Sequence, residues 1–233
     1  MIKALMSDID GTIIRKRIIS EETTRVIQHY MEDGLVILNT GRSYESIQSL
    51  QKEFNFACYD FAITCNGSYI CTKEGKVLLN ETLPEDLVHQ LLKILPESEL
   101  KIAAAGRIYK VEYPYSLPDG VQANEVNKIS IRVIDTPIEE ELQQRVKQLN
   151  LRLEINTHYA DLIPIQCNKG QGAHYLIQLL GLYDDEVLVV GDDYNDIAML
   201  KEFPHSYTFN DSPAPVQQVA HHCITSYGEL PCE

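Results

Sequence analysis

Two carboxylates near the start of the chain have a spacing that suits metal-assisted chemistry. Asp8 and Asp10 follow a largely apolar run over residues 2–6, which predicts a short buried strand, and Gly11 permits a tight turn beyond them. Carboxylates two residues apart at a strand end repel each other unless a cation or a proton intervenes. The pair suits a reaction with one carboxylate as nucleophile and the other as acid or base. Taken alone, it is equally compatible with an ordinary Asp-Gly turn.

Other polar groups follow predicted strands or begin a predicted helix farther along the chain. Thr40 follows an apolar run over residues 35–39, and a second acidic loop, residues 191–196, follows a strand over 186–190. Lys169 stands at the predicted start of a helix. Because the carboxyl ends of parallel strands meet at one edge of a sheet, we expect these groups to converge there.

The outer parts of the chain alternate strands with helices. The predicted strands are 2–6, 35–39, 61–64 and 186–190, with a hairpin over 69–72 and 76–79. The predicted helices are 20–33, 43–53, 170–180 and a segment that ends near 202, and the tail adds a strand, a helix from about 213 and a strand near 223. This alternation predicts a Rossmann-like core with a parallel sheet, in residues 1–82 and 166–233.

The middle of the chain, residues 83–165, has a different pattern. A helix is predicted over 84–95 and a second over 137–149, with strand-like runs at 101–105, 107–112, 128–134, 151–155 and 162–165. Strands and helices that do not alternate indicate an α+β unit. We therefore predict an α/β fold with an inserted α+β cap domain.

The charge balance limits the partners. The 233 residues carry a formal net charge of −14, which argues against nucleic-acid binding because that needs a basic face. The same charge would repel an anionic substrate, so local cations or a bound metal would have to offset it.

The chain has no sequence signal for a membrane or for secretion. No apolar run approaches the roughly 20 residues that span a bilayer, and Asp8 and Asp10 interrupt any signal-like stretch at the start. Six cysteines show no metal-ligand spacing and are expected to be reduced. We expect a cytoplasmic protein, monomeric or homodimeric, that does not bind membranes.

Four segments together resemble the motifs of the haloacid dehalogenase superfamily of phosphohydrolases. They are residues 8–12 (Asp-Ile-Asp-Gly-Thr), Thr40 within 38–42, Lys169 within 169–173 and residues 191–196 (Gly-Asp-Asp-Tyr-Asn-Asp). The insertion between the second and third motifs, with Asn66 and Gly67 before it, resembles the Cof-like branch with an α/β cap of class II, subclass B. The resemblance covers nearly the whole chain.

The resemblance implies a role for each motif residue. Asp8 would attack phosphorus and form an aspartyl phosphate, while Asp10 would protonate the leaving oxygen and then activate water. Thr40 would hydrogen-bond a phosphoryl oxygen, and Lys169 would neutralise charge on the phosphate and on Asp8. Asp193 stands at a position that is often small in the family.

The resemblance also implies a magnesium ion and a set of substrate contacts. Asp8, the Asp10 carbonyl and Asp192 would hold Mg²⁺, with Asp196 close by. The implied substrate contacts are Thr40, Gly41, Asn66, Lys128, Lys169 and Asn195. Further candidates in the insertion are Arg107, Asn124 and Arg132. A solvated strand face is the favoured interpretation of each of these and of Lys128, and Lys128 is preferred among the four because residues 126–130 resemble a recurrent cap segment of the family.

The implied activity is hydrolysis of a small phosphorylated metabolite, such as a sugar phosphate or a similar monoester. Two alternatives stay open at this point. The first is a phosphomutase of the same superfamily. The second is a regulatory protein with weak catalysis that binds a phosphorylated metabolite. Arg42 has two interpretations, as the partner of an acidic residue or as a surface side chain.

Overall fold

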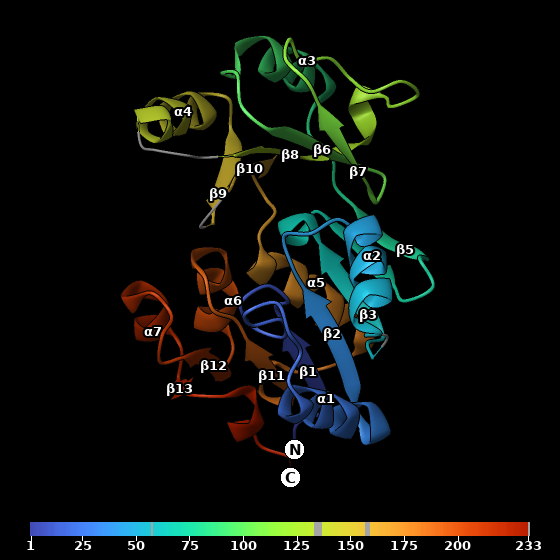
Figure 1. Cartoon of the computed structure of the whole chain (residues 1–233), viewed down its shortest axis with the longest axis vertical. Coiled ribbons are helices and arrows are strands. Elements are labelled where there is room, and N and C mark those ends of the chain that lie inside the picture. Colours follow the sequence, from blue (N-terminus) through green and yellow to red (C-terminus); the bar gives the residue numbers. More distant parts are fainter. Residues whose placement is uncertain (57, 133–136, 157–158, 233) are drawn as a thin grey trace.

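The computed structural model describes residues 1–56, 58–132, 137–156 and 159–232. Its elements form two lobes, each built on one sheet (Figure 1). The N- and C-termini lie together at the end of the larger lobe that is far from the smaller one (Figure 1). None of the helices in the described ranges has the length and apolarity needed to cross a membrane.

The larger lobe contains an eight-stranded sheet. In spatial order its strands are β13 (His222–Ile224), β12 (His205–Phe209), β11 (Val187–Val190), β1 (Ala4–Ser7), β2 (Leu35–Asn39), β3 (Phe61–Thr64), β4 (Tyr69–Thr72) and β5 (Val77–Asn80). The strands from β13 to β3 pair in parallel, and β4 and β5 add an antiparallel edge. Strands β1 and β11 are buried along their whole length, as expected for the centre of a sheet covered on both faces.

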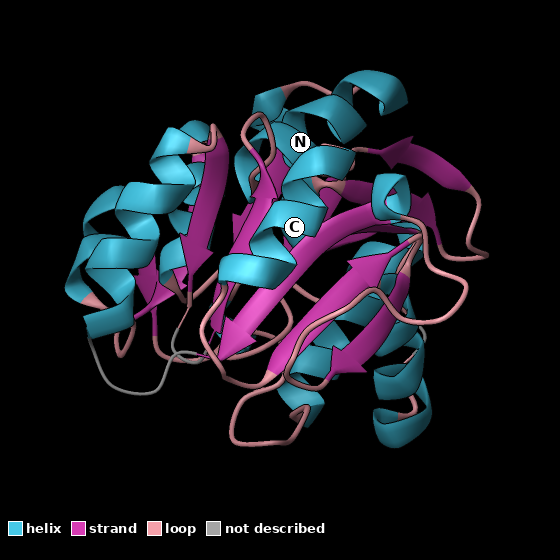
Figure 2. Cartoon of the chain, turned by 90° about the horizontal axis from the view of Figure 1, so that it is seen from above, coloured by secondary structure: helices cyan, strands magenta, loops and turns pink. Residues whose placement is uncertain are grey.

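Helices cover both faces of this sheet. Helices α1 (Glu21–Asp33) and α2 (Tyr44–Phe54) pack on one face, and α5 (Lys169–Leu180), α6 (Ile197–Glu202) and α7 (Ala214–Val219) pack on the other. In the view from above, helices lie on more than one side of the strands (Figure 2). Ser20 and Ser43 cap α1 and α2 by accepting backbone N–H groups of the first turn.

The smaller lobe contains a five-stranded antiparallel sheet. In spatial order its strands are β7 (Arg107–Val111), β6 (Leu100–Ala104), β8 (Val126–Arg132), β10 (Tyr159–Pro164) and β9 (Leu151–Ile155). Helices α3 (Glu85–Ile94) and α4 (Pro137–Gln148) belong to this lobe, and apolar side chains from both join the core beneath the sheet. Side chains alternate between the two faces of a strand, so the opposite face carries polar residues such as Lys101, Lys128 and Asp161.

The predicted fold class, an α/β core with a separate α+β unit, is confirmed. Strands β2, β3, β4 and β9 have the predicted bounds. The first three are short, largely apolar runs, and β9 alternates apolar and charged residues, which is also a strand pattern. Strand β10 begins at Tyr159, three residues before the prediction, since Ala160 and Asp161 also pair with β8. The acidic loop leads into a short 3₁₀ turn, Tyr194–Asp196, before α6 begins.

Candidate active site

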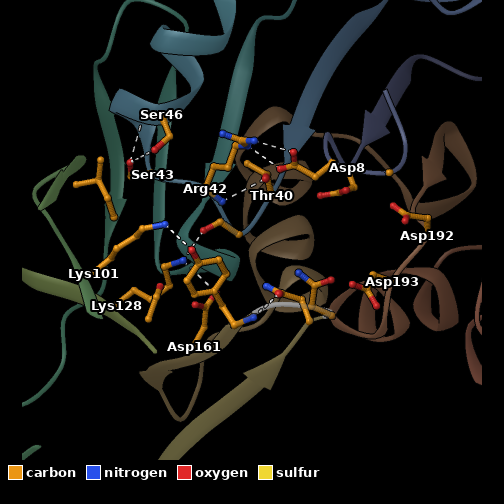
Figure 3. Close-up of a pocket in the computed structure, with 18 residues that line it drawn as sticks. Asp8, Thr40, Arg42, Ser43, Ser46, Lys101, Lys128, Asp161, Asp192 and Asp193 are labelled. Atoms are coloured by element: carbon orange, nitrogen blue, oxygen red, sulfur yellow. Dashed lines mark hydrogen bonds and ion pairs between the residues drawn. The ribbon is translucent and has the colours of Figure 1, made fainter. Parts of the chain in front are cut away.

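Polar residues at the carboxyl ends of β1, β2 and β11 line a cavity of about 540 Å³ between the two sheets. Figure 3 shows Asp8, Thr40 and Asp192 on the side of the larger lobe, with Lys128 and Asp161 opposite them on the ribbons of the smaller sheet. The expected convergence of these strand ends is therefore present in the structure.

Asp8 is held firmly at the floor of this cavity. Its backbone N–H donates to the Val190 carbonyl at 2.9 Å, which ties the end of β1 to β11. Its Oδ1 accepts a hydrogen bond from Lys169 Nζ at 2.6 Å. Within the described part of the chain, no hydrogen bond reaches the second carboxylate oxygen, Oδ2, so that oxygen is the one available for attack on a substrate.

Lys169 joins two carboxylates behind the cavity wall. It is the first residue of α5, which Asn168 caps, and its side chain is only 1% exposed. Its Nζ donates to Asp8 and to Asp196, both at 2.6 Å. Burial alone would lower the pKa of Lys169, but the two carboxylates outweigh burial and raise this pKa above its usual value. Lys169 therefore stays charged.

The acidic loop after β11 is organised around Asp196. Its Oδ2 accepts the backbone N–H groups of Asp192 at 3.0 Å and of Asp193 at 3.1 Å. The Asp192 carboxylate in turn accepts from the Thr12 hydroxyl at 2.6 Å. These contacts aim Asp192 toward Asp8 across the cavity floor.

Gly11 is required at this point for two reasons. Its φ of +85° lies in the left-handed region that side chains rarely adopt, and a Cβ there would stand 2.0 Å from the Asp192 carboxylate. The close approach of the first and fourth motifs therefore depends on the absence of a side chain at this residue.

Asp8, Asp192 and Asp196 form a group that fits a divalent cation. One oxygen from each lies within 4.8 Å of the others. Burial, together with Asp196 and Asp192, raises the pKa of Asp8 well above its usual value, against the opposing effect of Lys169. Burial and Asp196 raise the pKa of Asp192 to about 7. The single ammonium of Lys169 thus does not neutralise the three carboxylates. Mg²⁺ prefers such hard oxygen donors with excess negative charge.

The three carboxylates differ in how many of their oxygens already accept hydrogen bonds. Both oxygens of Asp196 already accept hydrogen bonds, from Lys169 and from the loop backbone. Asp196 therefore serves best as the support of the loop, while Asp8 and Asp192 each offer an oxygen toward the cavity.

Asp10 and Arg42 form a bidentate pair at the edge of the cavity. Arg42 Nε and one terminal nitrogen donate to the two Asp10 oxygens at 2.6 and 2.7 Å. Of the two interpretations of Arg42, the structure has the one in which it partners an acidic residue. The Asp10 side chain remains about half exposed, at 53%, and is therefore accessible to a substrate and to water.

Thr40 and Gly41 lie on the same wall of the cavity. Thr40 is 1% exposed, and its hydroxyl oxygen accepts the backbone N–H of Arg42 at 3.2 Å. Its hydroxyl hydrogen can therefore be donated to a bound phosphoryl oxygen. Gly41 contributes its carbonyl, which accepts from Lys128 Nζ at 2.7 Å.

A chain of buried amides and charges connects the two lobes. Asn195 Nδ2 donates to Asn66 Oδ1 at 3.1 Å, and Asn66 Nδ2 donates to Asp161 Oδ2 at 2.8 Å. Lys128 Nζ reaches the same Asp161 oxygen at 3.0 Å. Both residues are expected to contact substrate, but only Asn195 lines the cavity, whereas Asn66 is 1% exposed and is not among the lining residues. Asn66 instead positions Asp161, and Asn195 holds Asn66.

Asp161 is not among the site residues predicted from the sequence. Its signal is a single acidic residue inside a strand whose neighbours, Ala160, Leu162 and Ile163, are buried and apolar. A carboxylate that the fold buries to 1% exposure needs partners, and here those partners, Asn66 and Lys128, come from two different segments. The predicted strand began at Leu162 and so left Asp161 outside.

The other cap candidates lie away from the cavity. Arg107, Asn124 and Arg132 are exposed and are not among the residues that line it. Arg132 pairs with Glu99 at 3.1 Å. Lys101 and Tyr159 line the cavity from the smaller sheet in their place.

Residues 5–229 match the family model described as haloacid dehalogenase-like hydrolase. Among curated proteins, the 5-amino-6-(5-phospho-D-ribitylamino)uracil phosphatase YcsE of Bacillus subtilis is 26% identical over 208 residues. That alignment covers 86% of this chain and 81% of YcsE.

Solved structures share the fold over almost the whole chain. A haloacid dehalogenase-like hydrolase from B. subtilis superposes with a TM-score of 0.82 at 18% identity, covering 95% of this chain and 94% of the other. The subclass IIB sugar phosphatase BT4131 gives a TM-score of 0.77 at 20% identity, covering 95% and 92%. At these identities, the likeness concerns the fold.

Proposed function

Because the chain belongs to the haloacid dehalogenase-like hydrolases, in which its curated relatives include named phosphatases, we propose that it hydrolyses a sugar phosphate or a similar small monoester with the help of Mg²⁺. The observation that carries the proposal is the Asp8 carboxylate at the cavity floor. Lys169 holds one of its oxygens, and the other is available toward the cavity. The relatives named phosphatases favour hydrolysis over the phosphomutase alternative.

In the proposed first step, Asp8 Oδ2 attacks phosphorus, and the bond from phosphorus to the alcohol oxygen breaks. The leaving oxygen takes a proton from Asp10, so that the products are a neutral alcohol and an aspartyl phosphate. Thr40 donates its hydroxyl hydrogen to a phosphoryl oxygen, and Lys169 stabilises the carboxylate that attacks.

In the second step, Asp10 takes a proton from a water molecule as that water attacks phosphorus. The bond between phosphorus and Asp8 Oδ2 breaks, inorganic phosphate leaves, and both carboxylates return to their starting states. Mg²⁺, held by Asp8, Asp192 and the Asp10 carbonyl with Asp196 in support, would offset the negative charge that otherwise repels the phosphate.

A phosphate-release screen tests the proposed function directly. A panel of sugar phosphates, polyol phosphates and p-nitrophenyl phosphate should include substrates that release inorganic phosphate in the presence of Mg²⁺. Product analysis distinguishes hydrolysis from isomer interconversion. Release from no member of the panel, with folded protein and metal present, would contradict the proposal.

Removal of the metal should abolish turnover. We expect phosphate release to stop in excess chelator and to return with Mg²⁺, while Ca²⁺ supports it poorly because its coordination is larger and looser. Carboxylates must be ionised to bind a metal, so Mg²⁺ affinity should weaken as the pH falls below about 7, the raised pKa of Asp192. Titration calorimetry across pH measures this dependence, and an undiminished rate in chelator would exclude the metal assignment.

Asp10→Asn should produce a penalty that depends on the leaving group. The nucleophile and the carbonyl at residue 10 remain, but protonation of the leaving oxygen and activation of water are lost, a combined effect of about 10²–10⁴-fold. An alkyl phosphate should suffer at the first step, whereas p-nitrophenyl phosphate, whose phenolate leaves without a proton, should still phosphorylate Asp8. Rapid-quench mass spectrometry should therefore find phosphoprotein accumulating with p-nitrophenyl phosphate. A stable phosphoryl group on any residue other than Asp8 would contradict the mechanism.

A further inference from the structure

The cavity holds more negative than positive charge, and its cations are already paired. Among the described residues that line it, five aspartates face three cations. These are Asp8, Asp10, Asp161, Asp192 and Asp193 against Arg42, Lys101 and Lys128. The side of the cavity far from Asp8 therefore differs from a typical anion site, which would present an unpaired cation.

The carboxylate partners of these cations lie close to them. Arg42 pairs with Asp10 at 2.6 Å, and Lys128 pairs with Asp161 at 3.0 Å. Lys101 pairs with Glu99 at 3.1 Å and also donates to the Tyr159 hydroxyl at 2.7 Å. In Figure 3 the labelled Lys101, Lys128 and Asp161 lie together on the smaller sheet, across the cavity from Asp8.

Asp161 has an acceptor that the protein leaves unused. Its Oδ2 accepts from both Lys128 and Asn66, whereas its buried Oδ1 has no hydrogen-bond partner among the described residues. A buried acceptor without a donor costs free energy. Ser130 stands directly opposite Asp161 in the sheet and also lines the cavity, so the surroundings of Asp161 are polar.

These charges discriminate between two kinds of phosphomonoester. Because Asp161 Oδ1 is buried, a movement of the side chain must first expose it, and a hydroxyl on the leaving alcohol can then donate to it and satisfy it. A carboxylate or a second phosphate at the same place would be repelled by the Asp161 carboxylate. The cations near it already have carboxylate partners, so the loss of its hydration would not be compensated.

We propose that Asp161 is a specificity residue that selects phosphomonoesters with a neutral, hydroxyl-bearing leaving alcohol and rejects those with a second anionic group. This inference rests on the proposed phosphatase activity and specifies that the leaving alcohol is neutral. Lys128 forms an ion pair with the buried Asp161 carboxylate, and Asn66 orients it from the larger lobe.

Matched substrate pairs test the inference on the unmodified protein. Glycerol 3-phosphate and 3-phosphoglycerate of matching configuration differ only in a CH₂OH group against a carboxylate, and erythritol 4-phosphate and 4-phosphoerythronate form a longer pair. We expect kcat/KM to favour the neutral member of each pair by about tenfold or more, the size of a lost charge-assisted hydrogen bond. A preference for the carboxylate members would overturn the inference.

Asp161→Asn tests the residue itself. The amide has nearly the same shape, removes the negative charge and leaves Lys128 as a cation without its carboxylate partner. The preference for the neutral member should shrink by about tenfold or reverse. Asp86→Asn, the same chemical change at an exposed residue of α3, should leave the preference unaltered.

The double variant Asp161→Asn with Lys128→Gln leaves no buried unpaired charge and separates folding from selectivity. It should not gain activity on the carboxylate members, because the cation is gone. An unchanged preference in both Asp161 variants would overturn the inference while p-nitrophenyl phosphate hydrolysis stands. Absence of all phosphate release, from p-nitrophenyl phosphate as well, would instead refute the proposed function.

Discussion

Asp8→Asn is expected to reduce phosphate release by on the order of 10⁴-fold or more, the scale seen when a nucleophile is removed from an active site. An amide oxygen does not form the acyl phosphate, and it is a weaker ligand for a hard cation than a carboxylate. Steady-state phosphate release with p-nitrophenyl phosphate measures the loss. Full turnover by this variant would overturn the mechanism.

The same substitution should not destabilise the fold in the absence of metal. Burial and the neighbouring carboxylates raise the pKa of Asp8, which means that its charged form is disfavoured in the folded state. Asparagine has the same shape, and its carbonyl oxygen can still accept from Lys169. We therefore expect a Tm in chelator no lower than that of the unmodified protein, so that lost activity is separated from lost structure. The exposed Asp86→Asn change serves as the matched control.

Lys169→Met should reduce both activity and stability. Loss of the ammonium leaves Asp8 and Asp196 buried without a cation between them, and removal of one partner of a buried pair costs about 3–5 kcal/mol. Activity should fall by about 10²–10³-fold, as for the loss of one preorganised charge donor. Urea denaturation and phosphate release measure the two effects.

Magnesium should restore part of the stability that Lys169→Met loses, because a divalent cation can take over the neutralisation of Asp8. The gain in unfolding free energy on adding Mg²⁺ should therefore be larger for this variant than for the unmodified protein. Lys201→Met, at an exposed lysine of α6, provides the control for loss of a charge. Equal stability of both variants in chelator would contradict the assigned role of Lys169.

The sequence predicts this fold well because its strongest signals are local. Strands such as β2 and β3 are short apolar runs whose ends are marked by Thr40 and Asn66, so their bounds can be found without tertiary information. Helices α1 and α2 begin after serine caps that are visible in the sequence. The convergence of Asp8 and Asp192 then follows from the general topology of parallel sheets.

The contacts that tune the site are not local, and the sequence does not predict them. Arg42 meets Asp10 from 32 residues away, and Asp161 meets Asn66 from 95 residues away. No periodicity or spacing rule connects such pairs. The Arg42–Asp10 pair forms within the larger lobe, where the ends of the neighbouring strands β1 and β2 meet, whereas the Asn66–Asp161 pair forms only because the smaller lobe packs on the larger. The turn after Asp10 is expected from Gly11, but its two isolated bridges, Asp10 with Ile14 and Arg15 with Ile18, are not predicted by the sequence.

The two faces of the smaller sheet have different affinities for water. Its apolar face packs on its own helices, whereas the face toward the cavity offers ion pairs and amides such as Lys128 and Asp161. Separation of the two sheets would therefore hydrate these ion pairs and amides, whose heat-capacity contribution has the opposite sign to that of apolar surface. The enthalpy of an opening motion at this gap would thus vary less with temperature than that of unfolding, and its equilibrium would respond to ionic strength.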